Sequence, residues 1–137
     1  MMMKTLGGVT LGLMLWSGTG WAQPAAGNPV ILEPKPGAVL SSPVAIVLGM
    51  SDSPGSPQSL PALANGAHFH VLLDAPIPPA GKMFPMDARD IHLLHGESRK
   101  TVPLKPGTHT IQVVEGTASH TAVPGGRRSD PVTFEVK

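Results

Sequence analysis

The sequence of 137 residues contains no cysteine, no tyrosine and only five other aromatic residues. The lack of cysteine excludes disulfides and thiolate metal sites, so histidine, carboxylate and methionine are the remaining metal ligands. The shortage of aromatic rings counts against stacking platforms for nucleic-acid bases or for sugars. A formal net charge of +1 gives no indication of a nucleic-acid or anionic-membrane partner. Six histidines stand out against this background.

The first 22 residues have the form of a secretory signal peptide. Lys4 provides a positive start, an apolar run follows over 6–16, and small residues precede Gln23. The run is shorter than the roughly 20 residues needed to cross a bilayer. We therefore expect cleavage after Ala22, a periplasmic or secreted protein, and no membrane insertion after cleavage. Both tryptophans would leave with the peptide.

The remaining chain has little capacity for helices. Its prolines and glycines interrupt every window that could show helical apolar spacing. Short apolar or alternating runs indicate about seven strands, at 30–32, 44–48, 67–73, 90–95, 100–104, 108–115 and 131–136. We expect a flexible leader at 23–29 and one all-β domain at 30–137. Its predicted fold is an immunoglobulin-like antiparallel β-sandwich, with a small Greek-key barrel as the alternative.

The connections between these strands are also predicted. A segment rich in Ser and Pro, 51–61, reads as a mobile loop, and 75–80 as a second loop dense in proline. The segment 82–86 is expected to pack back onto the rim of the domain. Pro103 places the strand at 100–104 on a sheet edge, because proline cannot donate a ladder hydrogen bond. A long polar loop is expected at 116–129.

The strongest functional signal is the segment 68–74, which reads HFHVLLD. Alternate side chains of a strand point to the same face, so His68, His70 and Leu72 share one face and Phe69 lies on the other. Residues i and i+2 lie about 6.5 to 7 Å apart along a strand, a span that two imidazoles can close around one ion. Asp74 would lie on the same face if the strand continued, where it could orient a ring.

Other histidines could complete such a site. His92 and His95 are three residues apart in the segment DIHLLH, so a regular strand would direct only one of them to it. His120, in the long loop, is either a further ligand or exposed to solvent. His109 shares its predicted face with Ile111 and Val113, which favours a buried, hydrogen-bonded structural histidine over a ligand.

Two methionines and two adjacent arginines are weaker indications of a binding site. Met83 and Met86 could bind Cu(I) through their thioethers, or could simply pack the loop. Arg127 and Arg128 are interpreted as a solvated turn in preference to an anion site.

Three segments, in order, resemble a known family. The family has a His-rich strand that runs into Leu-Leu-Ile-Asp, a His-Leu-His-Phe-Gly stretch and a Pro-Gly-x-His-Thr-Leu-Gln-Leu strand. This chain has HFHVLLD at 68–74, HLLHG at 92–96 and PGTHTIQV at 106–113, followed by His120 and Ser129. In these segments it resembles the family of the domain of unknown function 4399, small exported bacterial domains, over about 66–136.

The chain also departs from the family pattern. ESRK at 97–100 replaces the family's Gly-Gln-Thr-Glu, Phe69 replaces the middle histidine of a triplet, and a second histidine after His120 is missing. The resemblance implies a fold and an exported location. It implies no activity.

Two functions fit these observations. The first is an exported, non-enzymatic domain that binds copper or zinc through His68, His70, His92, His95 and His120, with Asp74 and His109 as second-shell candidates. The alternative is an immunoglobulin-like interaction module, with a protein partner of unknown kind, whose histidines are structural. An enzyme is not expected, because no nucleophile-elbow serine and no glycine-rich phosphate loop is present.

Overall fold

The computed structural model describes residues 27–52, 60–61, 63–93 and 97–137. Within these ranges the chain forms eight strands and one short 3-10 helix, and no helix there is long and apolar enough to cross a membrane. The elements are β1 (Pro29–Glu33), β2 (Val39–Leu40), β3 (Val44–Met50), η1 (Ala64–Gly66), β4 (His68–Leu73), β5 (Asp90–His92), β6 (Arg99–Val102), β7 (Gly107–Gly116) and β8 (Val132–Val136).

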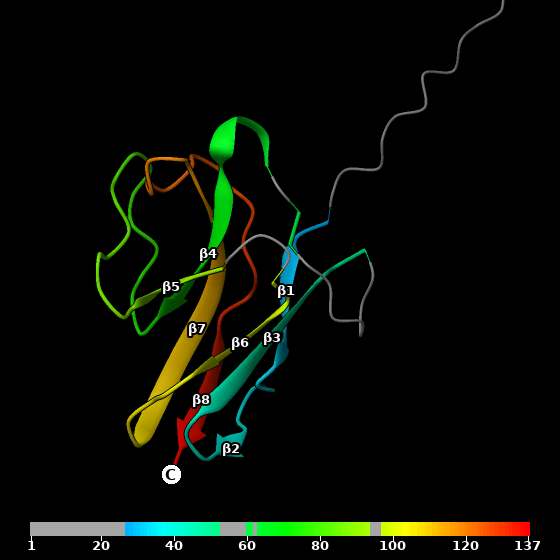
Figure 1. Cartoon of the computed structure of the whole chain (residues 1–137), viewed down its shortest axis with the longest axis vertical. Helices are drawn as coiled ribbons and strands as arrows, with labels where there is room; N and C mark the ends of the chain where they lie inside the picture. Colours follow the sequence, from blue (N-terminus) through cyan, green and yellow to red (C-terminus); the bar gives the residue numbers. More distant parts are fainter. Residues whose placement is uncertain (1–26, 53–59, 62, 94–96) are drawn as a thin grey trace, which may run out of the picture.

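The strands form two sheets, one with the order β1-β3-β6 and one with the order β2-β8-β7-β4-β5 (Figure 1). All neighbours are antiparallel except β2 and β8, which are parallel. Consecutive strands β1 and β2 lie in different sheets because Pro34, Pro36 and Gly37 break the chain between them. Gly37 has a φ of 76°, which glycine adopts without a steric penalty. The two separate sheets confirm the predicted all-β sandwich and not the barrel.

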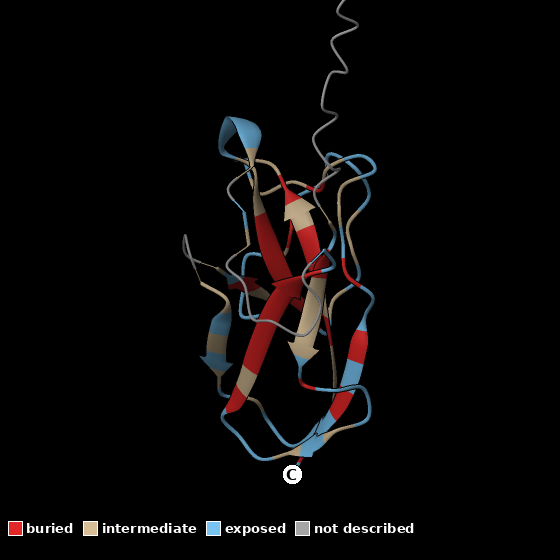
Figure 2. Cartoon of the chain, turned by 90° about the vertical axis from the view of Figure 1, so that its right-hand side faces the viewer, coloured by how far each residue is buried: buried red, intermediate tan, exposed pale blue. Residues whose placement is uncertain are grey.

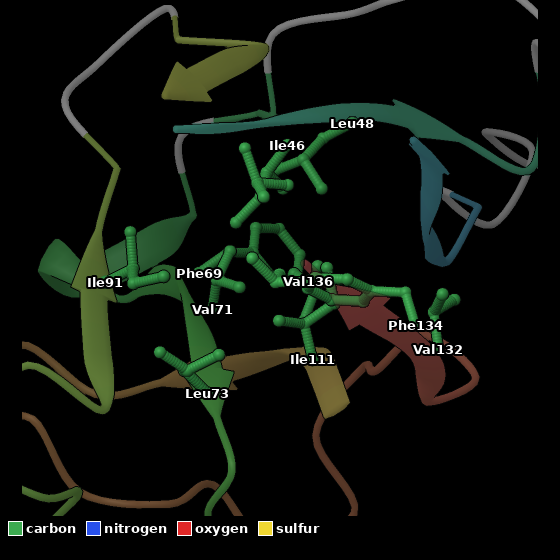
Figure 3. Close-up of a cluster of buried hydrophobic side chains, with 12 residues drawn as sticks. Ile46, Leu48, Phe69, Val71, Leu73, Ile91, Ile111, Val132, Phe134 and Val136 are labelled. Carbon is green, nitrogen blue, oxygen red and sulfur yellow. The ribbon is translucent and has the colours of Figure 1, made fainter. Parts of the chain in front are cut away.

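Apolar side chains from both sheets meet between them (Figure 3). In β4 the residues Phe69 and Val71 face this core, as the alternation predicts, and Ile46 and Leu48 of β3 approach from the opposite sheet. Figure 2 shows that buried positions occupy much of the long strands, whereas η1 is exposed. Burial of each large apolar side chain contributes about 1.5–3 kcal/mol.

The other face of β4 is also covered. Leu72 packs there with Phe84, Val114 and Ala122 in a second apolar cluster. The covering chain consists of the segment 82–86, which packs back as predicted, and part of the loop after β7. Backbone hydrogen bonds join the two: Phe84 N donates to His120 O at 2.9 Å, and Ala122 N donates to the carbonyl of Lys82 at 2.9 Å. The histidine-bearing face of β4 therefore lies beneath two loops and is not an open surface.

Several boundaries differ from the sequence prediction. The strand β2 was not expected, because a two-residue element gives no periodic signal and depends on its distant partner β8. Strand β5 ends at His92, where its ladder with β4 ends, and positions 94–95 of the predicted strand lie outside the described residues. Strand β6 is an edge strand, as Pro103 predicted. The predicted signal peptide, residues 23–26 of the leader and 53–59 of the first loop lie outside the described residues.

Candidate metal centre

The centre is built around His70, which is completely buried in the middle of β4. Its Nδ1 lies 2.8 Å from Oδ1 of Asp90. A carboxylate oxygen only accepts, so Nδ1 has the proton and Nε2 has the free lone pair. This Nε2 is buried and has no hydrogen-bond partner among the described residues. A buried polar atom without a partner costs about 1–3 kcal/mol, and a metal ion would satisfy it.

Burial also sets the charge state of this ring. It lowers the pKa of His70 below the ordinary value of 6.5, while the hydrogen bond and the charge of Asp90 act in the opposite direction. The neutral ring is the form that binds a metal. Asp90 resembles the carboxylate that commonly orients a metal-ligating histidine through its second nitrogen.

Strand pairing brings the next groups to the same place. His92 lies directly opposite His70 in the ladder between β4 and β5, and Asp90 lies opposite Leu72 on the same face. The second oxygen of Asp90, Oδ2, is 3.6 Å from Nε2 of His92. Because Asp90 and His92 are two residues apart in one strand, both side chains point toward His70.

His120 completes the group from the loop after β7. Its ring centre is 4.8 Å from that of His92 and 5.3 Å from that of His70. His70, Asp90, His92 and His120 each offer one ligand atom, and these atoms lie within 4.8 Å of one another. In a tetrahedral shell with bonds of about 2.1 Å, ligand atoms lie about 3.4 Å apart. Side-chain shifts of up to about 1.5 Å would therefore be needed for the imidazoles to share an ion.

His68 lies beside this group and is not part of it. Its ring centre is 4.4 Å from that of His70 and 5.1 Å from that of His120. Its Nδ1 is 3.1 Å from the carbonyl oxygen of Gly66, so this nitrogen donates and Nε2 has the free lone pair. His68 is thus a neighbour with a suitable donor atom.

A tight turn holds His120 in place. The residue has a φ of 61°, in the left-handed region, which costs a non-glycine residue about 1–2 kcal/mol. Its backbone N–H donates to the carbonyl of Thr117 at 3.0 Å, and the hydroxyls of Thr117 and Thr121 are 2.6 Å apart. The sequence predicted a polar loop here and left His120 as either a further ligand or a solvent-exposed residue; in the structure the turn directs His120 toward the other rings.

Close packing also fixes the position of the His70 ring. Phe84 packs against it with ring centres 4.6 Å apart and ring planes tilted by 40°. Gly116 lies so near that a Cβ there would be 2.9 Å from Cδ2 of His70 and 2.5 Å from Cε2 of Phe84. A glycine at this position is therefore required by the close approach of the two rings.

The sequence predictions for individual residues had different outcomes. The structure brings together His68, His70, His92 and His120, whereas His95 lies outside the described residues. Asp74 does not extend the face of His68 and His70: β4 ends at Leu73, and Asp74 has a φ of 51°. Its carboxylate instead binds Nδ1 of His109 at 2.6 Å, so neither residue is placed to support the centre. His109 is hydrogen-bonded, as the structural interpretation expected.

Sequence reasoning missed Asp90. The signal was present, because Asp90 and His92 have the same i, i+2 spacing as His68 and His70. The sequence instead pointed to Asp74 as the orienting carboxylate, and Asp90 was interpreted only as the first residue of a strand.

Comparison with known proteins gives one match. The model of the family described as "Domain of unknown function (DUF4399)" matches residues 47–137. This range includes all the residues of the centre described above. No curated protein and no solved structure matches the chain. Since the match spans well over half of the sequence, the chain belongs to the DUF4399 family.

Proposed function

We propose that this protein is an exported domain that binds copper or zinc and does not catalyse a reaction. The main support is the buried Nε2 of His70, which has no hydrogen-bond partner in the described part of the chain, while Asp90 orients the ring through Nδ1. Imidazole nitrogens are good ligands for Zn(II) and Cu(II). His70, His92 and His120 could supply three imidazole ligands and the neighbouring His68 a fourth, while Asp90 orients the ring of His70. A shell closed by the protein is typical of binding sites and not of catalytic ones.

Competition titration of the metal-free protein with Zn(II) and Cu(II) tests this proposal. We expect one ion per chain, with micromolar or tighter affinity. His70→Ala should abolish stoichiometric binding. Because His70 is buried, His92→Ala is the second variant: its side chain is 51% exposed, so the substitution leaves the core intact. Asp90→Asn should weaken binding by about 10–100-fold, as expected for a group that orients a ligand.

His109→Asn provides the matched control, because His109 lies outside the centre and should retain wild-type affinity. Acidification below about pH 6 should release the ion, since protonated imidazoles have no free lone pair. If the wild-type protein binds neither metal, or if binding survives both alanine substitutions, the proposal is wrong. That result would favour the interaction module with structural histidines.

Export is the second part of the proposal, and it is supported by the signal-peptide pattern of residues 1–22. Mass spectrometry of the protein recovered from the periplasm or the medium should find an N-terminus at Gln23. Retention of the intact chain in the cytoplasm would contradict it.

A further inference from the structure

Two exposed methionines lie beside the centre. The large hydrophobic side chains exposed in the described part of the chain are Val39, Met83 and Met86, with Met83 53% and Met86 86% exposed. Met50, by contrast, is 5% exposed and belongs to β3. Exposed thioethers contribute little to the core, but they are soft ligands available to a metal ion.

Both methionines open onto the same space as the imidazoles. A surface cavity of about 330 Å³ has Met83 and Met86 in its wall together with Asp90, His92 and His120. Asp87, which also borders this cavity, binds Arg89 through a bidentate ion pair, with Nη2 and Oδ2 2.8 Å apart. The thioethers and the two imidazoles are therefore the nitrogen and sulfur donors that this cavity offers.

The segment that contains the methionines is fixed to the turn of His120. Phe84 N donates to His120 O at 2.9 Å, and Met83 forms a β-bridge with Thr121. Both contacts involve the backbone at His120 and the residue that follows it. The distance between the methionine segment and the histidines is thus set by the fold and does not depend on a free loop.

We propose that Met83 and Met86 extend the centre into a Cu(I) site, in which their thioether sulfurs bind the ion together with His92 and His120. Thioethers favour Cu(I) and add little for Zn(II), which accepts imidazole and carboxylate equally well without them. The centre would then bind copper in either oxidation state, with the methionines taking part only in the reduced one. This inference rests on the proposed metal-binding function and specifies copper as its metal.

The test is an anaerobic titration of the purified protein with Cu(I) against a chromophoric Cu(I) chelator. The double variant Met83→Leu/Met86→Leu keeps the side-chain volumes and alters only exposed residues, so we expect it to fold normally. Its Cu(I) affinity should fall at least about tenfold, with Zn(II) affinity unchanged within about twofold. Met50→Leu is the control and should change neither affinity.

X-ray absorption provides a second readout. The Cu(I) form of the wild type should show sulfur in the first coordination shell, and the double leucine variant should not. Unchanged Cu(I) affinity in the double variant, or a Cu(I) shell without sulfur, overturns this inference while Zn(II) and Cu(II) binding can still support the proposed function. If the wild-type protein binds none of these metal ions, both the proposed function and this inference are wrong.

Discussion

At the scale of single residues, two features of the centre are unfavourable in themselves. Nε2 of His70 is buried without a partner among the described residues, and His120 has a left-handed backbone conformation. Such local costs persist where the surrounding packing enforces them, here the ring of Phe84 and the backbone of Gly116. The free-energy cost of burying Nε2 of His70 would be offset if this nitrogen bound a metal ion.

Gly116→Ala tests this packing. The new Cβ would lie 2.5 Å from Phe84 and 2.9 Å from His70, so both rings must move. We expect unfolding by urea to show a loss of about 1–3 kcal/mol, as is usual for overpacking, together with weaker metal binding. Gly37→Ala is the control: its φ of 76° makes alanine strained, but nothing lies within 4 Å of the added carbon. It should lower stability by about 1–2 kcal/mol and leave metal affinity unchanged.

An unchanged metal affinity in Gly116→Ala, with stability also intact, would show that the ring positions are not set by this contact. A loss of affinity in Gly37→Ala of the same size would show that general destabilisation, and not local packing, controls the site.

At the scale of elements, β4 and β7 are joined at the far end from the centre by a strap made of Asp74 and His109. Oδ1 of Asp74 accepts from Thr110 N at 2.8 Å, and Oδ2 accepts from His109 Nδ1. The other ring nitrogen of His109 donates to the carbonyl of Lys105 at 2.7 Å. Because both ring nitrogens lie next to hydrogen-bond acceptors, the protonated ring, which has two N–H donors, satisfies both of them. The Lys105 carbonyl, followed by Asp74, raises the pKa of His109 above 6.5.

This strap predicts a pH dependence of stability. A group whose pKa is raised on folding contributes its full stabilisation below its unfolded pKa, about 6.5 for histidine, and loses it as the pH rises through the folded value. The difference in unfolding free energy between wild type and His109→Asn, from urea titrations, should therefore be larger at about pH 6 than at about pH 9. Asp74→Asn should reduce this pH dependence. A difference that is constant, or that grows with pH, would contradict the assignment.

Most of the strands could be predicted from the sequence, because the alternation of apolar and polar residues and the proline or glycine residues at strand ends are local signals. The alternation of 68–73 correctly separated Phe69 and Val71 from His68 and His70. The pairing of His70 with His92 could not be predicted, because the register between β4 and β5 depends on contacts between segments some 20 residues apart in the chain. For the same reason Asp90 was missed, and the position of His120 depends on hydrogen bonds within its own turn.

At the scale of the whole molecule, the residues that form the main core and the residues of the centre lie on different faces of the larger sheet. One face of β4 and β7 faces the core between the sheets, and the centre lies on their opposite face under the loops 74–89 and 117–131 (Figure 1). Substitutions in the centre should therefore affect metal affinity more than folding. The His92 side chain is 51% exposed, and the cavity with Met83 and Met86 opens beside it, so an ion bound at the proposed centre would be reached from solvent on this side.

The most direct measurement is an anomalous-difference map from crystals of the protein grown with one equivalent of Zn(II), collected at the zinc absorption edge. The account predicts a single strong peak about 2.0–2.1 Å from Nε2 of His70, surrounded by His92, His120 and His68, with Asp90 still bonded to Nδ1 of His70. A map without a peak at this position, or with zinc bound only at His109 or at the chain ends, would contradict it.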